Sequence, residues 1–132
     1  RSIGEYLAIS TPKKIWKMPK ACLRIKSKVW LEKDGELVFG SGKAAILKAV
    51  FETGSINKAA KKLGMSYRHA WSYINSAEER FGERLLIKTK GGNSGGGAVL
   101  TEYAKIMLDE FGRLEAEARE FINRRYREIF GT

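Results

Sequence analysis

The chain of 132 residues contains one cysteine and one histidine, and this scarcity excludes several kinds of site. Cys22 alone cannot form an intrachain disulfide, and Cys22 with His69 supplies too few ligands for a structural zinc site. No Ser-His-acid arrangement and no pair of carboxylates stands out as an active site. We therefore expect a protein that is not an enzyme and that uses no cofactor and no metal.

Long apolar runs are also missing. No run approaches the roughly 20 residues that a membrane span needs, and no stretch has the order of segments found in a secretory signal peptide. The expected location is therefore the cytoplasm, and no membrane partner is expected.

Prolines are few, and both lie near the start of the chain, at Pro12 and Pro19. Proline removes a backbone donor and breaks helices, and the same stretch is rich in lysine. We expect residues 1–20 to form a basic arm. It could touch DNA, pack against a partner subunit, or be a loosely ordered terminus.

Acidic residues are outnumbered, because 25 Lys and Arg face 15 Asp and Glu. Residues 1–90 hold 19 basic and 8 acidic side chains, whereas residues 101–132 hold 6 and 7. A basic region beside a near-neutral one is typical of a nucleic-acid footprint joined to a protein-contacting element. The alternative is that the positive charge only keeps the protein soluble.

The pattern of residues 55–81 predicts two helices joined by a tight turn. Ser55 can cap the first helix through its hydroxyl, and Gly64 suits the left-handed residue that ends it. Ser66 can then cap a second helix over Tyr67–Phe81. A helix, a short turn with glycine and a second helix form a helix-turn-helix motif.

The second helix has two distinct faces. One face is apolar and should pack inward, with Ala70, Ile74, Ala77 and Phe81. The opposite face presents groups that can contact base edges and phosphates, from Arg68, Ser72 and Asn75, with Tyr67, His69 and Trp71 at its flanks. For Ser72 and Asn75 alone, an ordinary solvated surface is an equal alternative.

A glycine-rich hairpin follows the second helix. Residues 84–90 read as a strand and residues 98–100 as its partner, and five of the seven residues between them are glycine. A phosphate-binding P-loop is excluded, because no Lys-Ser or Lys-Thr pair follows the glycines. We expect a wing whose tip, with Gly92 and Asn93, reaches the DNA backbone or minor groove.

Another hairpin is predicted before the helices. Apolar residues alternate over residues 23–31, as in a strand with one buried face, and Asp34-Gly35 is a strong turn signal before residues 37–39. A helix over residues 43–53 should then support the motif. Its apolar stripe is expected to pack on Ile56, Leu63 and Ile74.

The last predicted helix begins after a capping Thr101 and runs to about Phe130, which is roughly 30 residues or ~45 Å. Its apolar residues step by four and three, as in a coiled-coil seam. The expected dimer interface comprises Ala104, Met107, Leu108, Phe111, Leu114, Ala118, Phe121 and Ile122. The simplest partner is the same helix of a second subunit; the alternative is that the helix folds back onto its own domain.

Several of these segments together resemble a known family. They are Gly54-Ser55-Ile56, the run Ser66-Tyr67-Arg68-His69-Ala70-Trp71, and the glycine-rich residues 91–101. This combination is similar to the N-terminal DNA-binding domain of the molybdenum-transport regulator ModE, a winged helix-turn-helix related to LysR-type regulators. The resemblance covers roughly residues 23–114.

The resemblance implies a homodimeric transcriptional regulator that places the helix from Tyr67 and the wing on DNA. In full-length ModE a C-terminal region binds molybdate. Because 132 residues leave no room for that region, we expect a regulator without the molybdate-binding domain and do not carry oxyanion sensing over.

The expected fold is mostly α with a small β content (α+β): a winged helix-turn-helix with an N-terminal β-hairpin. The expected parts are an arm (residues 1–20), the DNA-binding domain (residues 21–100) and a dimerisation helix (residues 101–132). The open alternatives in function are a non-specific DNA-compacting protein and a DNA-binding subunit that docks a separate effector-sensing partner.

We expect a homodimer on double-stranded DNA, reading a near-palindrome whose half-sites lie ~34 Å, or a small multiple of it, apart. Arg68 is the expected base contact, because a guanidinium can reach guanine O6 and N7 together. The expected contacts to phosphates, from ammonium groups and from N–H groups at two caps, are Ser55, Lys58, Lys61, Lys62, Ser66, Lys88 and Lys90.

Overall fold

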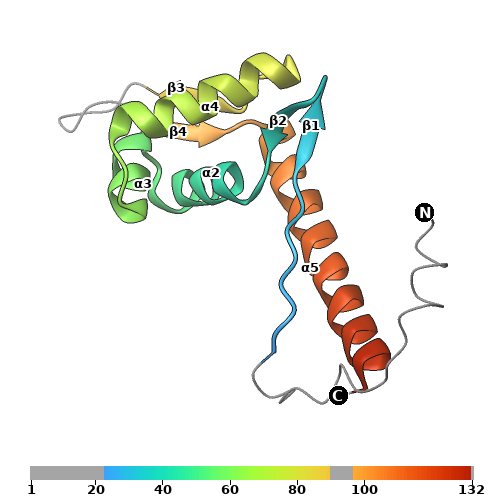
Figure 1. The fold of residues 1–132 in the computed structure, drawn as a ribbon. Helices are drawn as coiled ribbons and strands as arrows, with labels where there is room; N and C mark the ends of the chain where they lie inside the picture. The colour runs from blue at the N-terminus through green and yellow to red at the C-terminus, as the bar shows by residue number, and fades with distance from the viewer. Residues whose placement is uncertain (1–22, 90–96, 132) are drawn as a thin grey trace. The chain divides into compact units, whose positions relative to one another are not determined.

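A computed structural model describes residues 23–89 and 97–131 of the chain, in two compact units. The larger unit is Lys28–Glu117, and the described part of the smaller unit is residues 23–27 and 118–131. The predicted arm lies outside the described residues. The elements, in chain order, are β1 (Leu31–Lys33), β2 (Glu36–Phe39), α2 (Ser41–Thr53), α3 (Ile56–Leu63), α4 (Tyr67–Phe81), β3 (Leu86–Thr89), β4 (Gly97–Leu100) and α5 (Glu102–Phe130) (Figure 1).

The predicted helix-turn-helix is confirmed, with α3 and α4 at the expected bounds. The Ser55 hydroxyl accepts the N–H of Lys58 at 3.1 Å, and the Ser66 hydroxyl accepts the N–H of His69 at 3.0 Å. Gly64 ends α3 with a φ of 72°, a left-handed conformation that glycine adopts without steric cost. These local signals explain why the sequence pattern located both helices.

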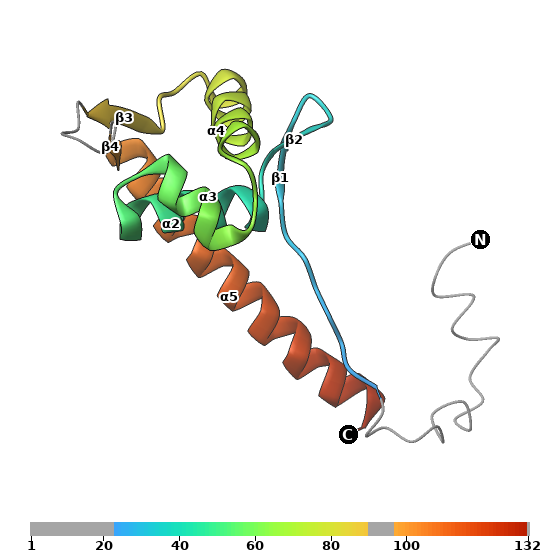
Figure 2. The same ribbon diagram turned by 90° about the vertical axis from the view of Figure 1, so that its left-hand side faces the viewer.

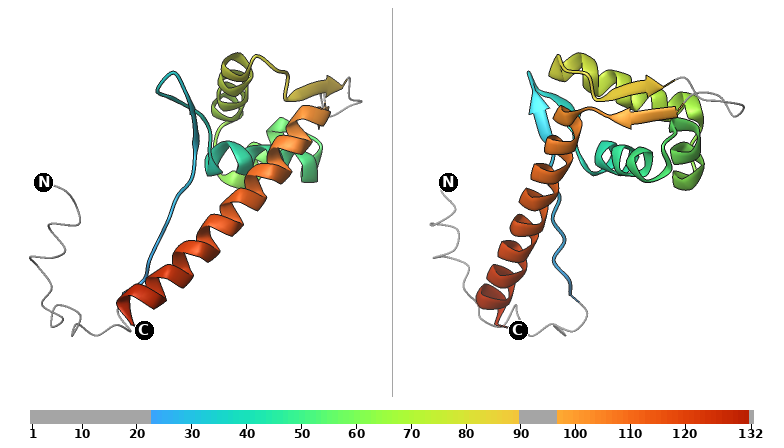
Figure 3. Two further views of the ribbon diagram at one scale, coloured as in Figure 1. Left: turned by 90° about the vertical axis from the view of Figure 1, so that its right-hand side faces the viewer. Right: turned by 180° about the vertical axis from the view of Figure 1, so that it is seen from behind.

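Two antiparallel hairpins lie on opposite sides of α4 within the larger unit. Strands β1 and β2 pair on one side, and β3 and β4 pair on the other. Figures 2 and 3 show α4 standing between the two hairpins. The fold is therefore the expected mostly helical one with small β content.

A cluster of aromatic rings joins the hairpin β1–β2 to α4 and α5. Phe39 contacts Phe111 edge-on at 5.0 Å between ring centroids and Phe81 at 6.0 Å, and Phe81 contacts Tyr103 at 5.7 Å. Edge-on pairs are favoured because a positive ring edge meets a negative ring face. The aliphatic part of the core is formed by Val38, Ile46, Leu47, Val50, Ile56, Ile74, Leu85 and Leu86. Together they fix the angle of α4.

The first predicted strand is mostly wrong. Only Leu31–Lys33 is a strand, whereas residues 23–30 have no regular secondary structure. Leu23 and Ile25, expected on a buried face, are exposed. The reason is that β2 has only four residues, so it offers no backbone partners to a longer strand.

Three side chains are placed differently from expectation. Ala104 and Phe111 were expected in a dimer interface, but they are 0% and 3% exposed within a single chain. The first turns of α5 therefore cover the protein's own core, as the fold-back alternative requires. Leu63, expected in the core, is 37% exposed, because it is the last residue of α3, where the chain turns away at Gly64.

Helix α5 has 29 residues and carries charged side chains along its length. Within residues 23–89 and 97–131, no helix combines the length and apolar character needed to cross a membrane.

The position of Phe111 predicts a stability difference. Phe111→Ala should lower the free energy of unfolding by about 3–5 kcal/mol, because it leaves a cavity among buried rings. Leu114→Ala, at a half-exposed site three residues later, is the matched control and should cost about 1 kcal/mol or less. Urea denaturation at low protein concentration measures both; equal losses would contradict the buried position of Phe111.

Candidate nucleic-acid interface

The first turns of α4 form an exposed polar surface. Tyr67, Arg68, His69 and Ser72 are all exposed, whereas Ala70 and Ile74 are buried beneath them. Because a helix turns by about 100° per residue, Arg68 and Ser72 project directly away from the core. Among the residues that the structure describes, none covers these two exposed side chains.

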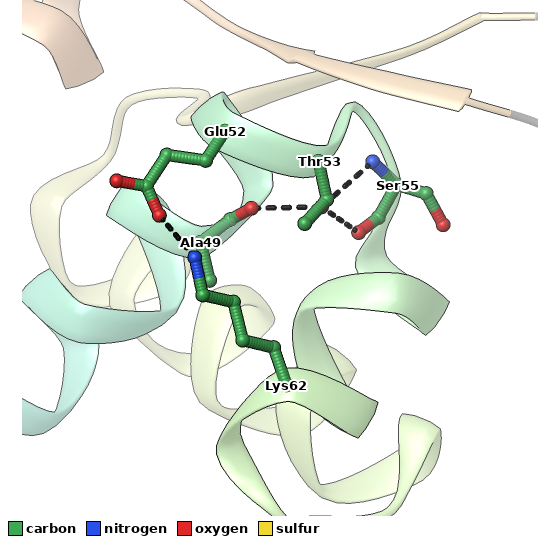
Figure 4. Close-up of polar contacts among 5 residues, drawn as sticks. All are labelled: Ala49, Glu52, Thr53, Ser55 and Lys62. Carbon is green, nitrogen blue, oxygen red and sulfur yellow. Dashed lines mark hydrogen bonds and ion pairs between the residues drawn. The ribbon is translucent and has the colours of Figure 1, made fainter.

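Helix α3 adds three lysines beside this face, and one of them is paired. Lys58 and Lys61 are exposed, and their ammonium groups make no hydrogen bond or ion pair with other described residues. The ammonium of Lys62 lies 2.6 Å from the carboxylate of Glu52 (Figure 4). The hydrogen bond from Lys62 lowers the pKa of Glu52. Lys62 is thus less available to a phosphate than its two neighbours.

The corner between α2 and α3 is held by Thr53. Its hydroxyl donates to the carbonyl of Ala49 at 2.7 Å and lies 3.0 Å from the carbonyl of Ser55 (Figure 4). Strand β4 is attached to the same corner, because the N–H of Ala98 donates to the carbonyl of Gly54 at 2.9 Å.

Gly97 makes this attachment possible. A Cβ at position 97 would lie 3.1 Å from the carbonyl oxygen of Gly54 and 2.7 Å from the Thr89 hydroxyl. The last glycine of the predicted loop is therefore required by the close approach of two backbones.

The wing is also attached directly to α4 through Glu78. One carboxylate oxygen of Glu78 accepts the N–H groups of Leu85 at 2.8 Å and Leu86 at 3.2 Å. The same carboxylate lies 3.7 Å from the guanidinium of Arg84. No sequence pattern indicates this role, since a glutamate near a helix end is most often a solvated residue.

On the wing side of α4, Trp71 and Lys88 face each other, with the ammonium 5.9 Å from the indole ring. They line a hollow of about 530 Å³ with the polar residues Asn75, Glu78, Glu79, Gly82, Glu83 and Arg84. Three carboxylates at the C-terminal end of this hollow would repel phosphates. The N-terminal half of α4, by contrast, contains no acidic residue.

On the other side of α4, the rings of His69 and Tyr73 lie 4.5 Å apart. The ammonium of Lys43 lies 5.0 Å from the Tyr73 ring. Lys43 and Tyr73 are absent from the predicted site. The signal for Tyr73 is its spacing of two residues from Trp71, which places it on the opposite flank of the helix.

Some predicted contacts lie outside the described residues: Lys90, Gly92 and Asn93. Their role at the wing tip stays a prediction. Of the remaining residues predicted for the dimer interface, Met107 and Leu108 pack partly against the core, and Ala118 and Ile122 are half-buried. Leu114 and Phe121 are 50% and 53% exposed.

With this geometry in place, comparison with known proteins identifies the fold family. Residues 43–105 match the model of the bacterial regulatory helix-turn-helix proteins of the LysR family. The chain contains a LysR-type helix-turn-helix domain. This LysR-type domain is similar to the protein in the crystal structure of a CbnR_DBD–DNA complex, with 26% identity and a TM-score of 0.50 over 64% of this chain and 92% of that one.

Curated relatives extend the similarity to molybdenum proteins. The chain is 33% identical over 95 residues to the molybdenum-pterin-binding protein MopB of Rhodobacter capsulatus, covering 72% of this chain and 35% of that protein. It is 31% identical over 101 residues to the molybdenum transport protein ModE of Azotobacter vinelandii, covering 76% and 37%. The resemblance to the ModE family is confirmed. The chain spans about a third of the length of these relatives.

The Glu78 contacts predict a local effect on the wing of the LysR-type domain. Glu78→Ala should speed hydrogen exchange at the amides of Leu85 and Leu86 and cost about 2 kcal/mol of stability, because two N–H groups lose a charged acceptor. Glu79→Ala removes a neighbouring exposed carboxylate and should leave both amides protected. Unchanged exchange in Glu78→Ala would mean that Glu78 does not hold the wing.

Proposed function

We propose that the LysR-type domain acts as a homodimeric transcriptional regulator that binds a near-palindromic DNA site. The observation that carries this proposal is the N-terminal half of α4, where Arg68 and Ser72 are exposed. The helix stands between the two hairpins (Figure 2). Such a regulator acts on genomic DNA, in the cytoplasm at the nucleoid.

The distribution of charge gives the direction of docking. Lys58 and Lys61 lie on α3, the helix that precedes α4, and Lys88 lies beside Trp71 in the first half of α4. The acidic residues 78, 79 and 83 line the hollow at its C-terminal end. Since phosphate contacts set the position of a protein on the duplex, α4 should enter the major groove with its N-terminal end first. The backbone N–H groups that begin α3 after Ser55 and α4 after Ser66 carry partial positive charge and add to the attraction for phosphates.

Arg68 is the proposed base contact. It lies in the first turn of α4, is exposed, and forms no ion pair with another described residue. A guanidinium with no competing carboxylate can make two hydrogen bonds to guanine in the major groove. Tyr67 and Trp71 lie beside it, 47% and 40% exposed, where they can meet thymine methyl groups or sugars.

The proposed dimer contact begins later in α5 than the sequence pattern indicates. Because Ala104 and Phe111 belong to the core, the side chains left for a partner helix are exposed ones, Leu114, Phe121 and Ile129. Exposed apolar side chains at this spacing are typical of a contact between subunits. A two-fold dimer presents two reading helices to one duplex.

Sequence reading by Arg68 can be tested by substitution. Arg68→Ala should weaken binding to a selected duplex by about 1–3 kcal/mol and relax the preference at one base position. Lys48→Ala, which removes the charge of an exposed lysine on α2, is the matched control. Fluorescence anisotropy with the selected duplex and with a random duplex measures both variants. Equal losses on the two duplexes would reject base reading and favour non-specific compaction.

Substitutions at the proposed dimer contact should change the mass of the protein in solution. Leu114→Glu together with Phe121→Glu should convert the protein into a monomer that binds the selected duplex poorly, because two charges would be buried at the contact. Ile87→Glu, a half-exposed position in the wing, should leave the mass unchanged. Sedimentation equilibrium decides the matter; a dimer that survives the double substitution points to another interface.

A further inference from the structure

A second basic hollow lies on the side of α4 away from the wing. It has a volume of about 390 Å³ and is formed by the β1–β2 hairpin, the start of α2 and the middle of α4. We call it the hairpin-side pocket. Its lining residues are Lys28, Trp30, Leu37, residues 41–43 and Tyr73, and none of them is acidic.

Lys43 is the unusual member of this pocket. It is only 8% exposed, yet its ammonium makes no hydrogen bond or ion pair with any residue that the structure describes. Its neighbour is the face of the Tyr73 ring, at 5.0 Å. Burial, and then the charge of Arg80, lower the pKa of Lys43. The side chain is largely buried, whereas the ammonium itself stays accessible from the pocket and has no counter-charge among the described residues, so the site favours an anion.

The start of α2 adds to the positive potential. Gly40 is the N-cap of this 13-residue helix and provides no side-chain hydrogen bond, and the first turn contains no acidic residue. The N–H groups at a helix start lack intrahelical acceptors and carry partial positive charge. Lys43 in the first turn therefore places a cation where an anion is preferred.

Arg80, the other cation nearby, is already engaged. Its guanidinium donates to the carbonyl of Leu37 and lies 3.4 Å from the carboxylate of Glu36. The Trp30 indole N–H likewise donates to Glu32 at 2.7 Å. Lys28, Lys43 and the backbone of residues 41–43 are therefore left as donors for a ligand, together with the hydroxyls of Ser41 and Tyr73.

We propose that the hairpin-side pocket binds a phosphate group through Lys43, Lys28 and the N–H groups that start α2. The phosphate group that we propose belongs to the backbone of the duplex in whose groove α4 would lie. The proposal therefore rests on the proposed DNA-binding function. A free phosphate ion has the same chemistry and is the other source to be distinguished.

The placement relative to α4 favours a duplex phosphate. Trp71 and Tyr73 are two residues apart and so project about 200° apart around the helix. Each lies beneath a lysine, Lys88 on the wing side and Lys43 on the hairpin side. A helix in the major groove has a phosphate strand on either side. Two lysine-aromatic pairs on opposite flanks suit these two strands.

Lys43→Met tests the proposal, because methionine keeps most of the unbranched apolar stem of lysine and removes its charge. Lys48→Met, an exposed lysine on the same helix, is the matched control, and Lys88→Ala serves as a reference for loss of a DNA contact. Duplex affinity is measured by anisotropy over a range of salt concentrations. Urea unfolding measures the stability of the DNA-free variants. Titration with inorganic phosphate, followed through the amide signals of residues 41–43, measures phosphate binding.

The expected result is that Lys43→Met binds the duplex about tenfold more weakly or worse, the effect of losing one charged hydrogen bond. The slope of the logarithm of its duplex affinity against the logarithm of salt concentration should be shallower than that of the parent protein by about 0.9. The free variant should be about as stable as the parent protein or more so, because the ammonium that is removed has no partner among the described residues. A merely structural lysine would instead lose stability and leave the salt slope unchanged.

The phosphate titration separates the two sources. Perturbation of amides 41–43 by inorganic phosphate in the parent protein and not in Lys43→Met, with an unchanged duplex slope, would support the pocket with free phosphate as its ligand. If neither duplex slope nor phosphate response changes in Lys43→Met while Lys88→Ala weakens DNA binding, the pocket proposal is overturned and the DNA-binding function stands. If no variant affects DNA binding, the proposed function fails instead.

Discussion

The attachment of the wing to the helix-turn-helix is the constraint on which the interface depends. Glu78 accepts two backbone N–H groups at the start of β3, and Ala98 donates to the carbonyl of Gly54 at the corner of α2 and α3. The two contacts hold opposite strands of the wing to different helices. The three residues that donate these N–H groups, Leu85, Leu86 and Ala98, are buried. The wing is therefore held in place by the protein itself, with Lys88 beside Trp71.

Charge is then distributed around α4 in a way that suits only one mode of docking. Cations flank its start, with each of two lysines above an aromatic ring, whereas carboxylates surround its end. The same glutamate that anchors the wing thus contributes to the repulsion of phosphates from the C-terminal half. Positioning of the wing and direction of docking are therefore parts of one arrangement, and the LysR-type fold supplies the frame for it.

Local signals made α3 and α4 predictable from sequence, because Ser55, Gly64 and Ser66 act within a few residues of their own positions. The outcome was different where distant partners decide. Residues 23–30 alternate like a strand but lack a partner long enough to pair with them. Phe111 fits a coiled-coil seam equally well, yet it packs on Phe39, some 70 residues earlier. The sequence around Lys43 contains no pattern that indicates its burial beside the hairpin.

The most direct test of the account is a map of backbone amide shifts as a duplex selected from a random pool is added to the protein. The account predicts the largest changes at residues 55–58, residues 66–72 and Lys88, with small changes at residues 78–83. Changes confined to α5, with residues 66–72 unaffected, would contradict the central claim that the exposed start of α4 is the surface that meets DNA.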